Sequence, residues 1–282
     1  MVEFPEVNGY EFIAAVVGKP IAHSLSPLIH NTAFRQEKLN WSYHAVEVSQ
    51  NEASECMTAV REKNIRGLSV TMPLKEAVIP YLDGLTETAS KLNAVNCVFW
   101  DGGDLIGDNT DGDGFVNALK LQLNEPLNGK TVAIIGAGGA ARSIINSLGD
   151  NPVKEIIVVN RSNPKAEKAA YLGGPNARVG SYGDLTACDI VVNSTPLGMA
   201  GTSEEAMLPV PVEFLSSTQT VIDLVYNPIE TELLRQAKGL GARTFSGLGM
   251  LIHQALLQFL LWTGLNTSIE GIESVVSDAV GG

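Results

Sequence analysis

An apolar strand in the middle of this chain runs directly into a glycine-rich loop, and a helical pattern follows the loop. The strand is Val132 to Ile135, and the loop reads Gly136-Ala137-Gly138-Gly139-Ala140. Glycine permits a tight turn and lets backbone N–H groups approach a pyrophosphate, while the N-terminus of the following helix contributes partial positive charge. Strand, loop and helix in this order predict a dinucleotide-binding fold, for which a glycine cluster alone would be weak evidence.

The residues after the next predicted strand indicate which dinucleotide is bound. An NAD-binding domain normally places an acidic residue there, about twenty residues after the glycines, to hold the ribose hydroxyls. This chain has Asn160-Arg161-Ser162 instead. Arg161 offers a planar fork for a 2′-phosphate and Lys165 adds a charge nearby, so NADP is favoured over NAD. The alternative is that both side chains are ordinary solvated surface charges.

Apolar runs of strand length alternate with helical patterns on both sides of the loop. The predicted strands are Phe12 to Val17, Tyr43 to Val48, Gly67 to Thr71, Glu155 to Val159, Asp189 to Asn193 and Thr220 to Val225, and the predicted helices include Pro27 to Leu39 and Glu52 to Lys63. Such alternation predicts an α/β protein with mostly parallel sheets that are covered by helices.

A change of pattern marks a domain boundary. Val95 to Trp100 and Leu105 to Asp108 flank Asp101-Gly102-Gly103, which is typical of an antiparallel hairpin. A helical stretch, Gly112 to Leu123, follows the hairpin and leads toward the strand before the glycine loop. We therefore expect the first domain to end near Asp111.

The composition argues against several classes of protein. The formal net charge is −12 and no stretch gathers Lys and Arg into a stripe, so we expect no nucleic-acid partner. The N-terminus lacks a basic region followed by an apolar run, which favours a cytoplasmic protein without a signal peptide. Leu248 to Trp262 is too short to cross a bilayer's ~30 Å hydrocarbon core, so we expect a core helix and no membrane association. Cys56, Cys97 and Cys188 match no metal-ligand spacing and are interpreted as buried reduced thiols.

Polar residues gather at the ends of the predicted strands in the first half of the chain, where open α/β sheets bind ligands. Ser24 and Ser26 stand between the first strand and the first helix, where their hydroxyls could donate to a carboxylate. Ser26 alone would be interpreted as a helix cap. Ser24 has no capping duty, which favours a binding role for the pair.

Lys75 ends the segment Val70-Thr71-Met72-Pro73-Leu74-Lys75, and we expect a helix to begin there. The helix dipole disfavours a cation at this position, which would ease loss of its proton and suit the amine to accept a proton from a hydroxyl. The alternative is a solvated lysine. Asp111 could accept a hydrogen bond from a substrate hydroxyl and orient Lys75, or cap the helix that follows it.

Two amides complete the candidate substrate site. Asn96 lies beside the predicted hairpin, close enough to reach a cleft. Gln254 lies in an otherwise apolar helix, where a buried amide needs a hydrogen-bond partner. A satisfied core glutamine is the alternative for Gln254.

These segments together resemble the shikimate dehydrogenase family, and the resemblance covers nearly the whole chain. The matching stretches are Ser24-Leu25-Ser26-Pro27, Val70-Thr71-Met72-Pro73-Leu74-Lys75, Ala94-Val95-Asn96, Asn109-Thr110-Asp111-Gly112, the glycine loop, Asn160-Arg161-Ser162, Tyr226-Asn227-Pro228 and Gly247-Leu248-Gly249-Met250 leading to Gln254. One departure is Lys165, where the family's pattern has a second arginine, and this favours a less rigid contact with the 2′-phosphate of NADP.

The resemblance implies a role for each matching residue. The implied substrate ligands are Ser24, Ser26, Thr71, Lys75, Asn96, Asp111, Tyr226 and Gln254, of which Lys75 and Asp111 form the catalytic acid/base pair. The implied cofactor-binding residues are Gly136, Ala137, Gly138, Gly139, Ala140, Asn160, Arg161, Ser162, Lys165, Ser194, Thr195, Leu224, Gly247 and Met250.

The resemblance also implies a domain organisation and an activity. Residues 1–111, completed by 248–282, would form a substrate domain, and residues 112–247 a Rossmann-type NADP domain. The implied activity is the reversible, NADP-dependent reduction of 3-dehydroshikimate to shikimate in aromatic amino acid biosynthesis. Thr71 favours a shikimate-specific enzyme. One alternative is an enzyme that also uses quinate or NAD. Another is a non-catalytic protein that senses NADPH and a metabolite. A homodimer is compatible with the sequence, which does not fix the oligomeric state.

Overall fold

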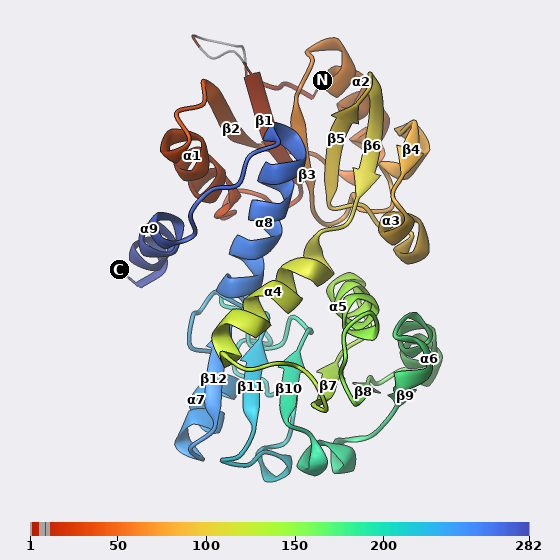
Figure 1. Cartoon of the computed structure of the whole chain (residues 1–282), viewed down its shortest axis with the longest axis vertical. Helices are drawn as coiled ribbons and strands as arrows, with labels where there is room; N and C mark the ends of the chain where they lie inside the picture. The colour runs from red at the N-terminus through yellow and green to blue at the C-terminus, as the bar shows by residue number, and fades with distance from the viewer. Residues whose placement is uncertain (1, 6–8, 10–11, 282) are drawn as a thin grey trace. The chain divides into compact units, whose positions relative to one another are not determined.

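The computed structural model describes residues 2–5, 9 and 12–281, which form two compact units (Figure 1). Unit 1 comprises the residues up to Thr110 together with Gln254–Ala279. Unit 2 comprises Asp111–His253 and the residues from Val280 on. Each unit is built around its own sheet, and each is described in turn. Of the N-terminal residues considered for a signal peptide, residues 1, 6–8, 10 and 11 lie outside the described part.

Unit 1 contains a mixed sheet whose described strands follow the order β2-β1-β3-β5-β6-β4. The strands are β1 (Phe12–Gly18), β2 (Trp41–Glu47), β3 (Gly67–Val70), β4 (Gly84–Leu85), β5 (Cys97–Asp101) and β6 (Asp104–Asp108). Strands β1, β2 and β3 are parallel, whereas β5 is antiparallel to both β3 and β6. Gly102 and Gly103 turn the β5–β6 hairpin with φ angles of 58° and 102°, which confirms the predicted hairpin.

Helices cover both faces of the sheet of unit 1. They are α1 (Ser26–Gln36), α2 (Ala53–Glu62), α3 (Glu87–Leu92), α8 (Leu248–Thr263, in unit 1 from Gln254 on) and α9 (Glu270–Gly281), with short 3₁₀ turns at Gln50–Glu52 and Ile79–Tyr81. Side chains alternate along a strand, so Leu68 and Val70 pack into the core with α2, and Gly67 and Ser69 face α8. Helices α1 and α8 meet through aromatic side chains on that second face.

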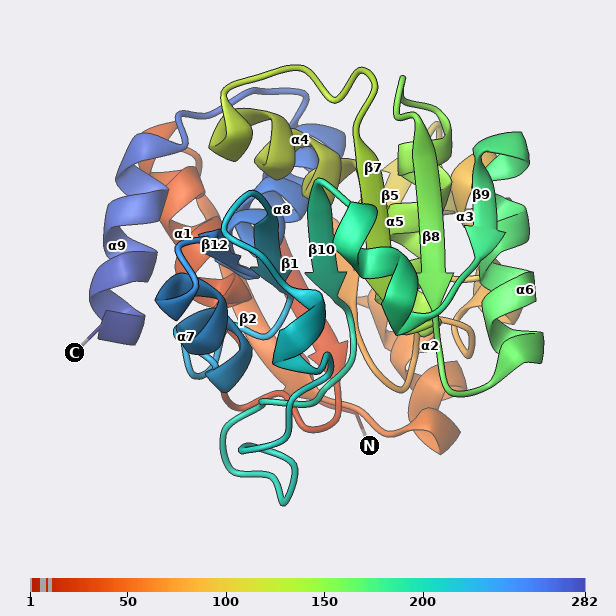
Figure 2. The same ribbon diagram turned by 90° about the horizontal axis from the view of Figure 1, so that it is seen from below.

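Unit 2 contains a parallel sheet whose described strands follow the order β12-β11-β10-β7-β8-β9. The strands are β7 (Thr131–Ile135), β8 (Glu155–Val159), β9 (Ala177–Val179), β10 (Ile190–Asn193), β11 (Thr220–Asp223) and β12 (Arg243–Ser246). Figure 2 shows β8, β9 and β10 pointing in the same direction. The strand order reverses between β7 and β10, and open α/β sheets bind ligands at such a reversal.

Two layers of helices and turns bury the sheet of unit 2. The elements are α4 (Asp111–Leu123), α5 (Gly139–Gly149), α6 (Asn163–Leu172) and α7 (Glu232–Gly239), with 3₁₀ turns at Gly174–Asn176, Tyr182–Ala187 and Val212–Phe214. Val132 and Ile134 pack with α4, α5 and α6 on one face, while Ala133 and Ile135 pack with α7 on the other. Such two-sided burial accounts for the continuous apolar strands of the sequence.

The predicted α/β class and the long elements are confirmed, and one local prediction is wrong. No α-helix begins at Lys75, because the chain forms turns there and then the 3₁₀ segment Ile79–Tyr81. Pro80 lies within that 3₁₀ segment and lacks the N–H donor that a continuing α-helix would need there. The three cysteines are free and buried, as expected. Within residues 2–5, 9 and 12–281, no helix is both long and apolar enough to span a bilayer.

Candidate functional site

The carboxyl ends of five strands in unit 2 lie in register at one edge of the sheet. Ile135 pairs with both Val159 and Asn193, and Asn193 pairs with Asp223, which in turn pairs with Ser246. The residue that follows each of these positions therefore lies at the same edge. These residues are Gly136, Asn160, Ser194, Leu224 and Gly247, all of which are cofactor candidates from the sequence.

The glycines of the loop are required for different reasons. Gly136 has a φ angle of +113°, and a Cβ there would lie 2.6 Å from Ser194 Oγ, so the protein itself demands glycine. At Gly138 and Gly139 neither a positive φ nor a protein atom within 4 Å demands it. Glycine at these two positions fits a loop that a ligand must approach closely. The N-terminus of α5 lies at Gly139, with no acidic side chain in its first turn.

The loop after β8 carries the candidate contacts to a 2′-phosphate. Asn160 Nδ2 donates to the carbonyl of Ser162 at 3.0 Å, which shapes the turn into α6. Arg161 and Lys165 are both exposed, and Lys165 lies in the first turn of α6. That turn contains no acidic residue, so the helix N-terminus and both cations present positive charge to a phosphate.

A buried carboxylate ties together the loops that follow β10 and β11. Asp223 is fully buried and accepts hydrogen bonds from Asn193 Nδ2 at 2.8 Å, Thr231 Oγ1 at 2.7 Å and the Val225 amide at 3.0 Å. Asn193 Oδ1 in turn accepts from the amide and the hydroxyl of Thr195. Burial raises the pKa of Asp223 to about 6, although its three donors act in the opposite direction.

The raised pKa of Asp223 makes stability depend on pH. The native state holds the proton of Asp223 up to about pH 6, whereas the unfolded chain releases it near pH 4. Stability should therefore fall by roughly 3 kcal/mol as the pH rises through this window. Asp223→Asn, a neutral isostere, should remove this part of the slope in urea denaturation measured between pH 4 and pH 7. An unchanged slope would contradict the assignment.

The substrate candidates of unit 1 gather at the carboxyl edge of β3. Val70 N donates to the carbonyl of Asn96 at 2.8 Å, and Val95 N donates to the carbonyl of Lys75 at 2.8 Å. Thr71 follows Val70 directly in the chain. The structure thus brings Thr71, Lys75 and Asn96 together, and it leaves Lys75 half-buried.

Buried amides connect this edge to helix α8. Asn96 Oδ1 accepts from the amide of Thr110 at 2.8 Å, and Asn96 Nδ2 donates to Thr110 Oγ1 at 3.1 Å. Gln254 Oε1 accepts from Gln258 Nε2 at 2.8 Å and from Asn96 Nδ2 at 3.5 Å. Because Gln254 Oε1 is occupied twice, any ligand of the Gln254 amide must accept a hydrogen bond from Nε2.

The hydrogen-bond chain continues into residues that the sequence analysis did not identify. Tyr43 OH donates to Ser69 Oγ at 2.6 Å, and Ser69 Oγ donates to Gln258 Oε1. Gln258 is 1% exposed, and its amide bonds fix the orientation of Gln254. The sequence signal was present, since Gln258 follows Gln254 by one helical turn in an apolar segment. Ser69 and Tyr43 gave no such signal, because polar residues within strands are common.

The serines before α1 are placed differently from helix caps. The N-cap residue of α1 is Leu25, without a side-chain cap, and Ser26 is the first helical residue. Ser24 Oγ accepts from the amide of Ser26 at 3.3 Å, and Ser26 is buried. The capping alternative for Ser26 is therefore wrong, whereas Ser24, which was expected to have no capping role, accepts from the first N–H of the helix.

Two of the predicted substrate ligands belong to unit 2. Asp111 is buried, and it is the first residue of α4 and directly follows Thr110 of unit 1. Tyr226 is half-buried in the loop after β11, and burial raises the pKa of its phenol. The remaining substrate candidates lie in unit 1, and all the cofactor candidates lie in unit 2.

Comparison with known proteins covers both units. Residues 16–98 match the family model of the shikimate dehydrogenase substrate binding domain, residues 118–228 that of shikimate / quinate 5-dehydrogenase, and residues 247–276 that of the shikimate 5'-dehydrogenase C-terminal domain. The shikimate dehydrogenase (NADP(+)) of Bacillus subtilis is 37% identical over 95% of this chain and 97% of its own length.

Two solved structures share the fold over nearly the full chain. Shikimate 5-dehydrogenase from Thermus thermophilus, in complex with NADP(H) and shikimate, has a TM-score of 0.87 at 35% identity and covers 95% of this chain and 99% of its own. Quinate dehydrogenase from Corynebacterium glutamicum, in complex with NAD, has a TM-score of 0.85 at 29% identity and also covers 95% of this chain and 99% of its own. The similarity therefore extends over both units.

Proposed function

Since this chain belongs to the shikimate dehydrogenase family, we propose that Lys75 and Asp111 transfer the proton in its reaction. The chain is an NADP-dependent oxidoreductase that interconverts 3-dehydroshikimate and shikimate in aromatic amino acid biosynthesis. The observation that supports the pair is its surroundings. The carbonyl of Lys75 accepts a hydrogen bond from the amide of Val95, the residue before Asn96. Asp111 directly follows Thr110, whose amide donates to the Asn96 side chain.

Oxidation of the substrate alcohol removes a proton from its hydroxyl and a hydride from its carbon. Lys75 Nζ accepts the proton of the C3 hydroxyl, and the carboxylate of Asp111 orients the Lys75 side chain and stabilises its positive charge after the transfer. NADP⁺, when bound, supplies the hydride acceptor. In the reductive direction the ammonium of Lys75 returns the proton to the carbonyl oxygen.

The other candidates divide between binding of the acid and binding of the cofactor. We assign Ser24 and Ser26 to the substrate carboxylate, and Thr71, Asn96, Tyr226 and Gln254 to its hydroxyls. Unit 1 is thus the substrate domain and unit 2 the cofactor domain, which also uses Ala137, Ala140, Thr195 and Met250. The open space at Gly138 and Gly139 and the basic first turn of α6 support this assignment.

Substrate and cofactor selectivity are tested by one set of assays. Values of kcat/KM for shikimate and quinate, each with NADP⁺ and NAD⁺, should be highest for shikimate with NADP⁺. Comparable values for quinate would favour an enzyme that uses both acids. A quinate dehydrogenase is among the solved structures that this chain resembles. Absence of turnover in all four pairings would favour a sensor instead.

Gly139→Ala should separate cofactor binding from folding. Alanine at this helical position should stabilise the chain by about 0.5–1 kcal/mol, because glycine is the poorer helix former. The added methyl group enters the space that the pyrophosphate approaches, so KM for NADP⁺ should rise about tenfold or more. Gly239→Ala in α7 is the matched control, since a Cβ at Gly239 also meets nothing within 4 Å. Equal cofactor kinetics in both variants would remove Gly139 from the cofactor site.

Gln258 is a positioning residue for Gln254. Gln258→Leu keeps the volume of the side chain but releases the Gln254 amide, so KM for shikimate should rise about tenfold while KM for NADP⁺ stays unchanged. Gln258→Glu keeps the acceptor for Ser69 but loses the donor to Gln254 Oε1, and it should show the same split. Equal effects on both KM values in steady-state assays would indicate a general structural role.

A further inference from the structure

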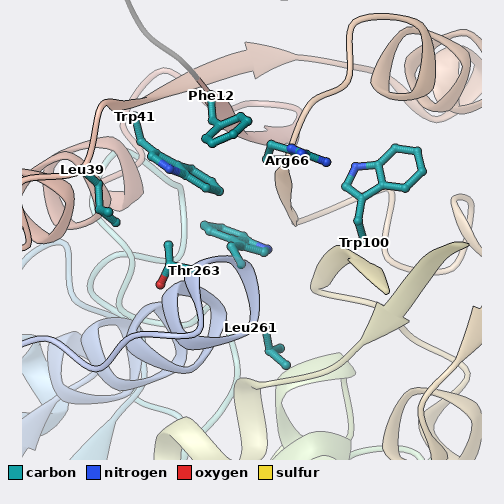
Figure 3. Close-up of a pocket in the computed structure, with 8 residues that line it drawn as sticks. Phe12, Leu39, Trp41, Arg66, Trp100, Leu261 and Thr263 are labelled. Atoms are coloured by element: carbon teal, nitrogen blue, oxygen red, sulfur yellow. The ribbon is translucent and has the colours of Figure 1, made fainter. Parts of the chain in front are cut away.

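An aromatic cavity of about 330 Å³ lies in unit 1 at the edge of the sheet opposite Thr71 and Asn96. Phe12 and Trp41 begin β1 and β2 and pair with each other, and Arg66 directly precedes β3. Trp100 in β5 also lines the cavity (Figure 3). Trp262 near the end of α8 completes its aromatic lining. The cavity therefore shares no lining residue with the substrate or cofactor candidates, and its volume is in the range of small-molecule clefts.

The aromatic walls are held in place by specific contacts. Trp100 Nε1 donates to the carbonyl of Ile65 at 2.8 Å, and Trp262 Nε1 donates to the carbonyl of Val98 at 3.1 Å. A Cβ at Gly67 would lie 2.3 Å from the Trp262 ring, so only glycine lets this ring approach the strand. Fixed rings that remain half-exposed are preorganised to stack on a flat ligand.

Arg66 gives the cavity its charge. Its guanidinium carbon lies 4.9 Å from the centroid of Phe12, and in Figure 3 the side chain points toward Trp100. Within residues 2–5, 9 and 12–281 no carboxylate forms an ion pair with Arg66, and none of the lining residues is acidic. A guanidinium stacked on a ring keeps its N–H edge available for a two-oxygen acceptor.

We infer that this cavity binds a small planar aromatic carboxylate. The rings of the walls take the aromatic face of the ligand, and the guanidinium of Arg66 takes its carboxylate. Neither group alone specifies this ligand, since rings accept any flat molecule and an exposed arginine accepts any anion. Because the rings and Arg66 line the same cavity, a ligand that uses both must be aromatic and must carry a carboxylate.

Intrinsic fluorescence reports on this cavity directly, because Trp41, Trp100 and Trp262 are the three tryptophans of the chain and all of them line it. Titration of the full chain with benzoate, in the presence of saturating shikimate, should change the emission saturably. Benzamide lacks the charge and cyclohexanecarboxylate lacks the aromatic ring, so both should bind at least about tenfold more weakly, which corresponds to ~1.4 kcal/mol.

Variants of Arg66 test the charged contact. Arg66→Gln should weaken benzoate binding at least about tenfold, and Arg66→Lys, which keeps the charge without the planar fork, should lie between it and the native chain. Arg61→Gln is the matched control, because Arg61 pairs with Asp83 on the surface of the same unit away from the cavity. Benzoate affinity of Arg61→Gln should be unchanged, and thermal melting verifies that each variant is folded.

Several results would overturn the inference. Displacement of benzoate by shikimate would place the probe in the substrate site, and equal affinity for benzamide would remove the role of Arg66. An emission that changes with protein concentration rather than with benzoate, together with self-association in sedimentation, would show that a second copy of the chain covers the cavity. None of these results bears on the roles of Lys75 and Asp111, so this inference and the proposed function fail independently.

Discussion

Replacing Lys75 with methionine is expected to lower kcat for shikimate oxidation by about 10²–10⁴-fold, the usual contribution of a positioned acid or base. Methionine keeps the length of the side chain but cannot exchange a proton. The backbone bond from Val95 N to the Lys75 carbonyl does not depend on the side chain, so the fold and the binding of NADP⁺ should persist. Steady-state rates of NADPH formation, with thermal melting of the same samples, measure both effects.

Lys91→Met is the matched control for this experiment. Lys91 is an exposed lysine in the last turn of α3, within the same unit as Lys75. Its loss should leave kcat within experimental error of the native enzyme. Equal turnover of Lys75→Met and Lys91→Met would remove Lys75 from the mechanism, and the proposed pair with it.

Replacing Arg161 with aspartate is expected to reverse the preference between the two cofactors. A carboxylate repels the 2′-phosphate of NADP⁺ but accepts hydrogen bonds from the ribose hydroxyls of NAD⁺. The ratio of kcat/KM with NADP⁺ to that with NAD⁺ should fall by about a hundredfold or more, since a charge-assisted bond is lost and a repulsion is added.

Arg235→Asp makes the same change of charge on α7, outside the loop that follows β8. It should leave the ratio of the two kcat/KM values unchanged. If Arg161→Asp also left the ratio unchanged while Lys165→Ala lowered it, the phosphate contact would belong to the first turn of α6 and not to the end of β8. Salt dependence of KM for NADP⁺ offers a second measure, because an exposed ionic contact is screened as ionic strength rises.

The longer strands and helices could be predicted from local sequence patterns, because tertiary packing agrees with these patterns. A strand such as β8, buried on both faces, must be apolar throughout, so its bounds were predicted residue for residue as Glu155–Val159. The short strands β4, β9 and β12 went unpredicted, because their two to four residues form no continuous apolar run. Their pairing depends on neighbours that only the assembled sheet provides.

The candidate site was predictable where a residue has no structural duty. Gly138 and Gly139 were identified from the order of strand, glycine loop and helix, and no packing requirement in the fold explains them. Lys75 was identified for the wrong reason, since the expected helix dipole is absent there. Tyr43 and Ser69 were not identified, because their contribution is a hydrogen bond to Gln258, which is remote in sequence. Such long-range partners leave no local signal.

The division of unit 1 into two segments affects how a newly synthesised chain matures. Gln254 and Gln258 leave the ribosome after the whole segment Asp111–His253 of unit 2, although their partners Asn96 and Ser69 emerge early. Domains tend to fold as they emerge, so unit 2 can be complete while the polar groups of unit 1 still bond to water. A released chain that ends after His253 should accordingly bind NADP⁺ and fail to recognise the acid.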